Sequence, residues 1–586
     1  MVDRWVVETP LSERFPVYTR ANVGEVFPDP VTPLSFSLAF QDGEELMGSE
    51  MGFRDAYVRM GGFDHDEFTS EHPVFIGVFG GYCYLNASAM RLFGERAPGM
   101  TAQTIDDQFF GAQPGIPPYV QRDGDVRPEK TEKIGEMFQW AFGVQQLDEV
   151  LADRAMLEQL RADRPDVASM STEDLLARGR QIYDDHFRHL FGQHLFITGL
   201  ATVPVAALTE ICTAVGRPED VMKLIAGVGD VESAAPSAAM WDLGRIAASS
   251  SSVMAAFDAG VAGLLGRLAA SDDPAASKFL TGFDQFLYDF GSRGPNEWEV
   301  SCSTWEVEPE LALAAIDRMR LSPDSASPLG HQAELAADRE RIGAEIAEML
   351  AGDAEASGTF QAALNAARVF MAGRERTKTN CVKMIQETRV LHFEWARRYV
   401  EAGHMNQVED FAMLTWDELE RFVADPEGSG LRGVIDARRA DYEELRGLQE
   451  PFIVFGDVPS PATFERRDAV EVEPVAVGDV LQGVPGCPGV SQGRARVVLD
   501  SHDPTALEPG DVLVAPLTDP SWTPLFVPAG GVIVDVGAPL SHAIIVSREL
   551  GIPCAVSVTD ATRRIPDGTL VQVDGGSGQV TILELP

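Results

Sequence analysis

The chain has 586 residues, of which 45% are hydrophobic and 23% are charged, and its formal net charge at pH 7 is −43. This length exceeds what a single hydrophobic core supports, so about three domains are expected. The acidic excess argues against nucleic acid and against an anionic membrane surface as partners, because both would repel the chain.

The cysteines and the N-terminus indicate the compartment. Six cysteines lie far apart without metal-ligand spacing, which is typical of reduced thiols in a cytosolic protein. The first residues lack an apolar run of signal-peptide length. The apolar stretch 195–208 is too short to span a bilayer and predicts a buried helix segment. We therefore expect a cytoplasmic protein with no membrane partner and no nucleic-acid partner.

Composition divides the chain into four ranges. Residues 1–125 are rich in glycine, proline and phenylalanine and predict an irregular N-terminal part, in which Phe36 and Phe40 lie at helical spacing. In residues 126–450 apolar side chains recur three and four positions apart, which predicts a helical domain. Residues 451–480 contain several prolines and predict a linker.

Residues 481–586 predict a compact α/β domain, because short β-branched runs alternate with glycine and proline. Within this domain, residues 532–536 predict a buried strand that Gly537 and Pro539 end. Ser541 can cap a helix that runs from His542 to about Leu550, with Gly551 as its left-handed end. The predicted fold class is therefore a multidomain chain with a large, mainly α-helical region and a C-terminal compact α/β domain.

His542 lies where a predicted strand turns into a predicted helix. Unpaired backbone N–H groups and the positive end of the helix dipole favour an anion there. The same field disfavours an imidazolium and so favours a neutral, nucleophilic ring. We predict that His542 carries a phosphoryl group, with Gly537 and Ser541 in the loop next to it. The alternative is a structural histidine at a helix start.

This stretch resembles a known signature. Gly537 to His542 and the helix that follows resemble the phosphohistidine motif of the phosphoenolpyruvate-utilising swivelling domains, and the likeness extends over about residues 481–582. It includes the segments 485–497, 508–514, 518–523 and 574–578. Ala538, Ile544 and Ser547 depart from the usual pattern, but the nucleophile is kept. The resemblance implies a swivelling phosphohistidine domain.

Residues 371–389 predict a helix with a cationic face. Arg374 and Lys378 are four residues apart and share that face with apolar side chains. Two such cations repel each other, so the arrangement favours an anion between them, for which a phosphoryl group is suitable. Arg389 follows about three turns later, beyond reach of the same phosphate. The alternative is that Arg374 and Lys378 pair with acidic residues of neighbouring helices.

A second segment combines a helix end with two charges. The predicted helix that carries Phe283 and Phe290 ends at Gly291, and Arg293 and Glu297 follow in a glycine-proline turn. A helix cap with a surface ion pair is the alternative. His186, His189 and His194 lie on a helical stretch without a carboxylate-rich metal pattern, so we interpret them as structural and predict no metal site.

Both segments, together with residues 22–34, resemble the acceptor-binding region of rifampicin phosphotransferase and of aryl phosphate synthases. By that resemblance, residues 1–125 and 126–450 form an acceptor-binding region. Arg374 and Lys378 hold the phosphoryl group, and Glu375 orients or deprotonates the acceptor hydroxyl. The predicted substrate-binding residues are Arg293, Glu297, Arg389 and Phe36.

The sequence shows neither an ATP-grasp pattern before residue 450 nor room for a phosphoenolpyruvate-binding barrel after residue 578. We therefore expect no cofactor on this chain itself. By the resemblance to two-component aryl phosphate synthases, we expect a separate ATP-grasp subunit with ATP and Mg²⁺ to charge His542, and the phosphoryl group to pass to a small phenolic acceptor. Two alternatives stay open: a component of a rifamycin-type antibiotic phosphotransferase, and a non-catalytic binding or regulatory protein with a relic domain.

Overall fold

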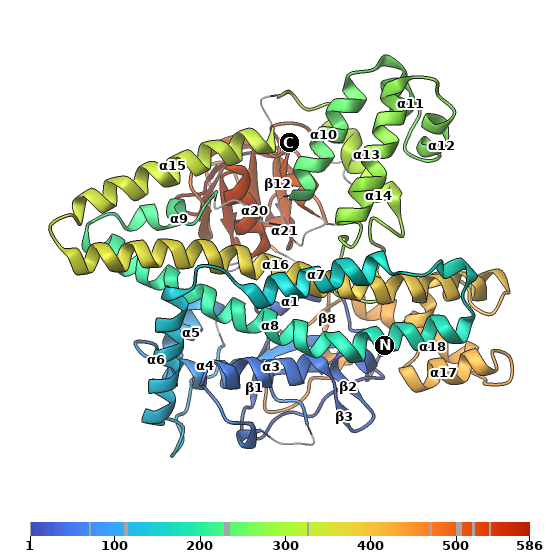
Figure 1. The fold of residues 1–586 in the computed structure, drawn as a ribbon, viewed down its shortest axis with the longest axis horizontal. Helices are drawn as coiled ribbons and strands as arrows, with labels where there is room; N and C mark the ends of the chain where they lie inside the picture. The colour runs from blue at the N-terminus through green and yellow to red at the C-terminus, as the bar shows by residue number, and fades with distance from the viewer. Residues whose placement is uncertain are drawn as a thin grey trace. The chain divides into compact units, whose positions relative to one another are not determined.

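The computed structural model describes residues 2–68, 72–110, 115–227, 232, 235–324, 327–467, 472–499, 507–518, 522–537 and 541–586. The chain forms two compact units (Figure 1). Unit 1 comprises Met1–Pro204, Trp298–Cys302 and Asn365–Val470, and unit 2 comprises Val205–Glu297, Ser303–Leu364 and Glu471–Pro586. Both are discontinuous, whereas the predicted ranges are contiguous. The long helices α8 (Thr172–Ala214) and α16 (Ala354–Glu401) pass from one unit to the other without a composition change that would mark a boundary.

A four-stranded sheet in unit 1 joins the two ends of its sequence. Its order is β4 (Ile76–Phe79), β5 (Tyr82–Asn86), β1 (Val17–Thr19) and β7 (Ile453–Phe455). β7 pairs antiparallel with β1, so the first part of the predicted linker 451–480 belongs to this sheet. Residues 1–125 also contain α3 (Gly48–Arg59), α4 (Ala87–Arg96) and α5 (Ala102–Phe109), which is more regular structure than predicted. Strands of three to five residues are too short to show a clear period.

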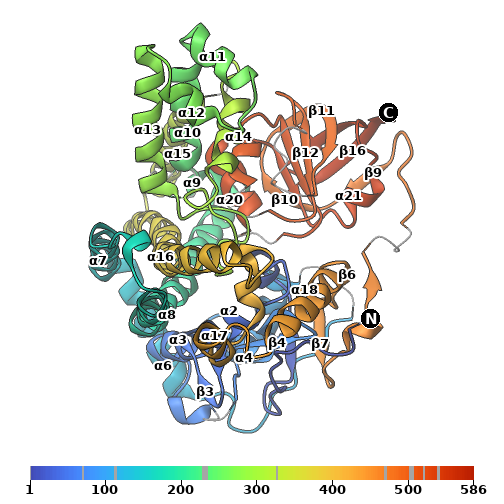
Figure 2. The ribbon, with the colours of Figure 1, turned by 90° about the vertical axis from the view of Figure 1, so that its right-hand side faces the viewer.

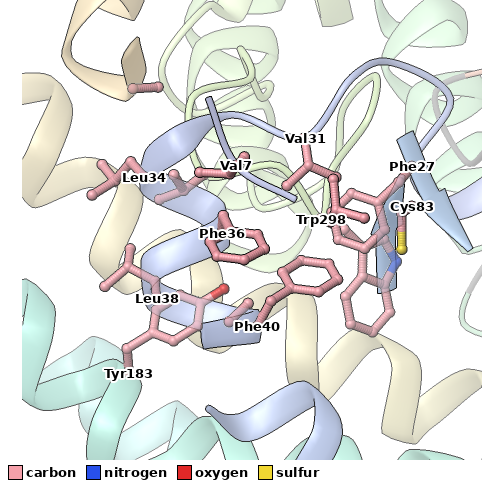
Figure 3. Packing of buried hydrophobic residues seen from close by; sticks show 14 of the residues in the cluster. Val7, Phe27, Val31, Leu34, Phe36, Leu38, Phe40, Cys83, Tyr183 and Trp298 are labelled. Atoms are coloured by element: carbon pink, nitrogen blue, oxygen red, sulfur yellow. The ribbon is translucent and has the colours of Figure 1, made fainter. Parts of the chain in front are cut away.

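Phenylalanine packs the core of unit 1 (Figure 3). Phe36 begins and Phe40 ends a short π-helix, η1 (Phe36–Phe40). Their rings stack with centroids 6.0 Å apart. The short segment Trp298–Cys302 is anchored beside them, because Glu299 accepts hydrogen bonds from Thr32 Oγ1 (2.8 Å) and Ser35 Oγ (2.6 Å).

The part of unit 1 that lies within residues 126–450 is mainly helical, as predicted. It contains α6 (Pro128–Gly143), α7 (Asp148–Ala162), α17 (Trp416–Ala424), α18 (Arg432–Arg446) and parts of α8 and α16. Polar contacts join α7 and α8 to α16, since Arg154 Nε donates to Asn380 Oδ1 (2.8 Å) and Thr388 Oγ1 donates to Gly179 O (3.1 Å). Figure 1 shows these helices side by side.

α8 includes the apolar stretch 195–208 and is longer than that stretch suggested. By length and composition alone it could cross a membrane, with 39% of its most apolar window buried inside the protein. The core helices of soluble proteins pass the same test, so one such helix does not decide the localisation.

Unit 2 contains a helical part and the C-terminal sheet. The helices are α10 (Ala235–Ala248), α11 (Ser251–Asp258), α12 (Leu264–Ala269), α13 (Pro274–Phe290), α14 (Pro309–Met319) and α15 (Pro328–Met349). Phe279, Phe283 and Phe286 of α13 are buried and stack in series, with successive centroids 6.0 Å apart.

The C-terminal sheet has eight strands in the order β10-β14-β13-β12-β11-β15-β16-β9. Strands β11 to β14 run parallel to one another, and the remaining pairs are antiparallel. The bounds are β9 Val480–Gln482, β10 Val484–Cys487, β11 Val490–Val497, β12 Val512–Ala515, β13 Gly531–Val534, β14 Cys554–Val556, β15 Leu570–Asp574 and β16 Gln579–Glu584. This confirms the predicted multidomain fold class with a C-terminal α/β domain.

Alternating side chains give the parallel strands two buried faces, and Figure 2 shows α20 (His542–Leu550) and α21 (Ala561–Arg564) beside the sheet. Leu513, Val532 and Val534 pack in the cluster that contains α19 (Thr523–Phe526) and α20. Val514 and Ile533 pack in the cluster that contains α21. Because other side chains cover both faces of the sheet, the sequences of these strands are continuous apolar runs.

Candidate functional site

The turn between β13 and α20 positions His542. α20 begins at His542 and ends at Leu550, and Gly551 has a left-handed φ of 66°, so this predicted helix is confirmed. Ser541 occupies the N-cap position as predicted, but its side chain makes no capping hydrogen bond. Gly537 leaves little room, since a Cβ there would lie 2.8 Å from Val556 Cβ. The turn residues 538–540, including Ala538 and Pro539, lie outside the described residues.

Two threonine hydroxyls bracket the His542 ring. Nδ1 lies 3.1 Å from Thr518 Oγ1, and Nε2 lies 3.2 Å from Thr523 Oγ1. The ring of Phe526 meets the imidazole edge to face at 5.9 Å. Hydroxyls can donate and accept, so this pair suits a neutral imidazole with one N–H and one bare nitrogen. A ring nitrogen with a lone pair is the form that attacks phosphorus.

Sequence reasoning missed the roles of Thr518 and Thr523. Both belong to the segment 518–523 that carried part of the resemblance, and both are buried, at 2% and 1% exposure. The segment 518–523 was recognisable as part of the family motif. The sequence alone did not show that the hydroxyls of its two threonines contact the His542 ring. Residues 519–521 of that segment lie outside the described residues.

The second group of predicted site residues lies on α16 in unit 1. Arg374 Nη1 donates to Glu375 Oε1 at 3.1 Å, and the two side chains are 17% and 7% exposed. His194 of α8 joins them, because its Nδ1 lies 3.1 Å from Thr377 Oγ1. Burial, followed by the charges of Arg374 and Lys378, lowers the pKa of His194 to about 3. The structure therefore brings Arg374, Glu375 and Lys378 into one cluster with a histidine.

Arg293 and Glu297 form an ion pair in unit 2, in the turn after α13. Arg293 Nε lies 3.3 Å from Glu297 Oε2, and the side chains are 3% and 1% exposed. The alternative of a surface ion pair is therefore wrong. The turn packs tightly, because a Cβ on Gly294 would lie 2.7 Å from Ser303 O.

Arg389 and Phe36 lie in the core of unit 1. Arg389 is fully buried and donates to Gln386 Oε1 (2.7 Å) and Glu299 O (2.8 Å). Phe36 is 8% exposed within the phenylalanine cluster of Figure 3. These are structural contacts, and the substrate-binding roles of both residues stay predictions. Among the described residues, no group of three or more His, Cys, Asp and Glu side chains is arranged to hold a metal ion.

Two family models match the chain. Residues 507–578 match the PEP-utilising enzyme mobile domain, and residues 194–375 match the rifampicin phosphotransferase fourth domain. The predicted resemblance to the phosphoenolpyruvate-utilising mobile domains and to rifampicin phosphotransferase is confirmed. His542 lies within the first match, and His194, Arg374 and Glu375 lie within the second.

The chain is also similar to curated proteins. The prodigiosin synthesizing transferase PigC of Serratia marcescens is 25% identical over 606 residues, which cover 99% of this chain and 64% of that protein. A rifampicin phosphotransferase of Bacillus subtilis is 29% identical over 311 residues, covering 52% of this chain and 35% of the relative. An uncharacterised Mycobacterium tuberculosis protein is 32% identical over 296 residues, which cover 50% of this chain and 30% of that protein. The chain thus spans about a third of the length of the latter two relatives.

Proposed function

We propose that this chain is a phosphotransferase component in which His542 carries the phosphoryl group. The observation that supports this most is the His542 ring at the start of α20, held between two hydroxyls inside the match to the mobile domain. A bare ring nitrogen attacks the phosphorus of the donor, the donor's P–O bond breaks, and an N–P bond forms. The phosphohistidine then delivers its phosphoryl group to a hydroxyl.

The acceptor site is the cluster on α16. Arg374 and Lys378 bind the phosphoryl oxygens, where fixed positive charge stabilises the charge that spreads over them during transfer. Glu375 is held by Arg374 and orients the acceptor hydroxyl. Arg293, Glu297, Arg389 and Phe36 are further binding candidates. Gly537 and Ser541 line the phosphate on the carrier side.

A separate ATP-grasp subunit supplies the phosphoryl group in this proposal. It binds ATP and Mg²⁺ and transfers the β-phosphoryl group to His542, which leaves AMP and inorganic phosphate. The acceptor is a small phenol, as in aryl phosphate synthases, and the reaction takes place in the cytoplasm. Relay through a tethered carrier keeps the effective concentration of the phosphoryl group high at the second site.

A rifamycin-type acceptor is the second candidate. The match of residues 194–375 to the rifampicin phosphotransferase fourth domain and the relatives of that name favour it. The acceptor's size distinguishes the two, because a phenol is one ring and a rifamycin is a large macrocycle.

The experiment uses ATP labelled at the β-phosphorus, the full chain and any ATP-grasp protein that co-purifies with it. We expect label on the wild type and none on His542→Ala. Addition of 4-cresol or rifampicin then shows which hydroxyl removes the label. Absence of label from both proteins would support the relic alternative and contradict the proposal.

A further inference from the structure

A histidine of α8 completes the cluster on α16. Sequence reasoning interpreted His194 as structural, and the resemblance gives it no role. Its Nδ1 lies 3.1 Å from Thr377 Oγ1 and 3.5 Å from Thr198 Oγ1, and its ring centroid lies 5.9 Å from that of Trp298. We propose that Nε2 of His194 is the general base that takes the proton from the acceptor hydroxyl. This inference rests on the proposed function and adds a catalytic residue to it.

The hydrogen bonds of Thr377 fix which ring nitrogen carries the proton. Thr377 Oγ1 donates its single hydrogen to the carbonyl of Arg374 at 3.0 Å, and a carbonyl can only accept. Thr377 Oγ1 must therefore accept at its contact with His194, so Nδ1 is the N–H donor. A neutral imidazole with its proton on Nδ1 keeps a lone pair on Nε2. This lone pair on Nε2 can accept the proton of the acceptor hydroxyl.

Glu375 is less suited to this step. Its Oε1 already accepts from Arg374 Nη1 at 3.1 Å, and the pair lies next to each other on one helix. His194 comes from a different helix, α8, and the residue is partly exposed.

The surrounding charges make the base responsive to phosphate. Burial first, and then the charges of Arg374 and Lys378, lower the pKa of His194 to about 3, while a hydrogen bond with the Arg374 backbone acts in the opposite direction. A phosphoryl anion between these cations offsets their charge, which raises the pKa of His194. The ring is therefore a weak base in the empty site and a stronger base once the phosphoryl group is present.

The step balances as follows. The acceptor O–H bond breaks and its proton goes to His194 Nε2, the oxygen lone pair forms the new P–O bond, and the N–P bond to His542 breaks. The electron pair of that bond returns to the His542 ring. His194, then an imidazolium beside two cations, loses its proton to water when the phosphorylated product leaves.

The tautomer can be tested without any donor or acceptor. In protein labelled with [¹⁵N]histidine, the His194 signals are assigned from their loss in His194→Asn, and their shifts show which nitrogen is protonated. We expect the proton on Nδ1 at neutral pH and a rise in the pKa of His194 when inorganic phosphate is added. A proton on Nε2, or a pKa that phosphate does not change, would overturn the inference even if the proposed function holds.

Transfer kinetics test the role itself. Phosphoramidate charges imidazoles chemically, so full-length protein is charged on His542 with it and then mixed with 4-cresol as the probe acceptor. His194→Asn keeps a donor for Thr377 and lacks Nε2. We expect it to charge normally and to transfer roughly 100-fold more slowly, within the range of general base catalysis. It should also lose the acidic limb of the wild-type pH profile.

His189→Asn is the matched control on the same helix, because His189 Nε2 contacts Asp153 Oδ1 at 2.8 Å and lies outside the cluster. It should transfer at the wild-type rate. Full transfer by His194→Asn would show a structural role for the ring and would overturn the inference. A wild type that charges but never transfers to 4-cresol or rifampicin counts against the proposed function, and the tautomer measurement then decides the inference alone.

Discussion

In the proposed function the ring of His542 is the reactive group, and two neighbouring hydroxyls contact its nitrogens. Thr518 and Thr523 hold Nδ1 and Nε2 at 3.1 and 3.2 Å, and the ring is only 7% exposed. An incoming phosphoryl group must therefore displace one hydroxyl while the other keeps the ring oriented. The hydroxyl that stays also stabilises the tautomer that reacts.

Valine in place of either threonine tests this arrangement, because it keeps the shape and removes the hydroxyl. Each of Thr518→Val and Thr523→Val leaves a buried ring nitrogen without that partner, which costs about 1–3 kcal/mol of unfolding free energy. We expect urea denaturation to show this loss and phosphoramidate to charge His542 more slowly. The serine variants keep the hydroxyl and should behave like the wild type. Unchanged stability and charging in both valine variants would contradict the positioning role.

Asp535, just after β13, predicts a specific pH dependence. Burial raises its pKa to about 6, although Thr562 N donates to its Oδ1 at 2.9 Å. The folded protein thus holds this proton more tightly than the unfolded chain. Between about pH 4 and pH 6 the contribution of Asp535 to stability falls as the pH rises, by up to about 3 kcal/mol.

Asp535→Asn removes this titration and keeps an oxygen for Thr562. The variant should gain stability relative to the wild type as the pH rises from 4 to 7, measured by urea denaturation at each pH. A difference between the two proteins that does not change with pH would contradict the assignment.

Single residues were predictable where the local sequence sets their environment. His542, Ser541 and Gly551 took their predicted positions because a strand end, a polar residue and a glycine define a helix start and stop within a few residues. His194 was missed because its partners Thr377 and Trp298 lie far away in the sequence, and periodicity shows a face without showing what packs on it.

At the scale of elements, the parallel strands of the C-terminal domain present His542 at the carboxyl end of β13. Glycines allow the close backbone contacts of this sheet. A Cβ on Gly575 would overlap the carbonyl oxygen of Cys487 and lie 2.6 Å from Cys554 N, whereas a Cβ on Gly576 would meet only Asp574 Oδ1, at 3.3 Å. The first glycine is therefore required by packing and the second is not.

Gly575→Ala should destabilise the domain by about 1–3 kcal/mol, because the backbone of β10 and β14 must shift. Gly576→Ala is the adjacent control and should change the free energy of unfolding little. The measurement is thermal or urea unfolding of the two full-length variants. Equal stability of both would show that the sheet edge relaxes at no cost.

The structure confirms the predicted strand 532–536 as β13 (Gly531–Val534), because its β-branched residues and the glycine after it define it locally. β7 was assigned to a linker because three residues between prolines show no period, and only its pairing with β1, over 430 residues earlier in the chain, makes it a strand. Such long-range pairing is invisible to local patterns.

At the scale of the whole molecule, the relay requires the C-terminal domain to change its contacts. Within unit 2, α20 contacts α15 and α19 contacts α14, and one apolar cluster includes residues of both parts. His542 is 7% exposed in this arrangement. Because the ring has so little exposure, the proposed relay predicts that these contacts open when a donor charges His542.

The central claim is that a phosphoryl group passes through His542. In a single turnover, full-length protein charged with ³²P-phosphoramidate is isolated, mixed with 4-cresol or rifampicin, and sampled over time for label on the protein and on the acceptor. The account predicts an acid-labile label on the His542 peptide that disappears at the rate at which labelled acceptor appears, and no labelled acceptor with His542→Ala. Labelled acceptor formed by His542→Ala, or label that stays on His542 with every acceptor, would contradict it.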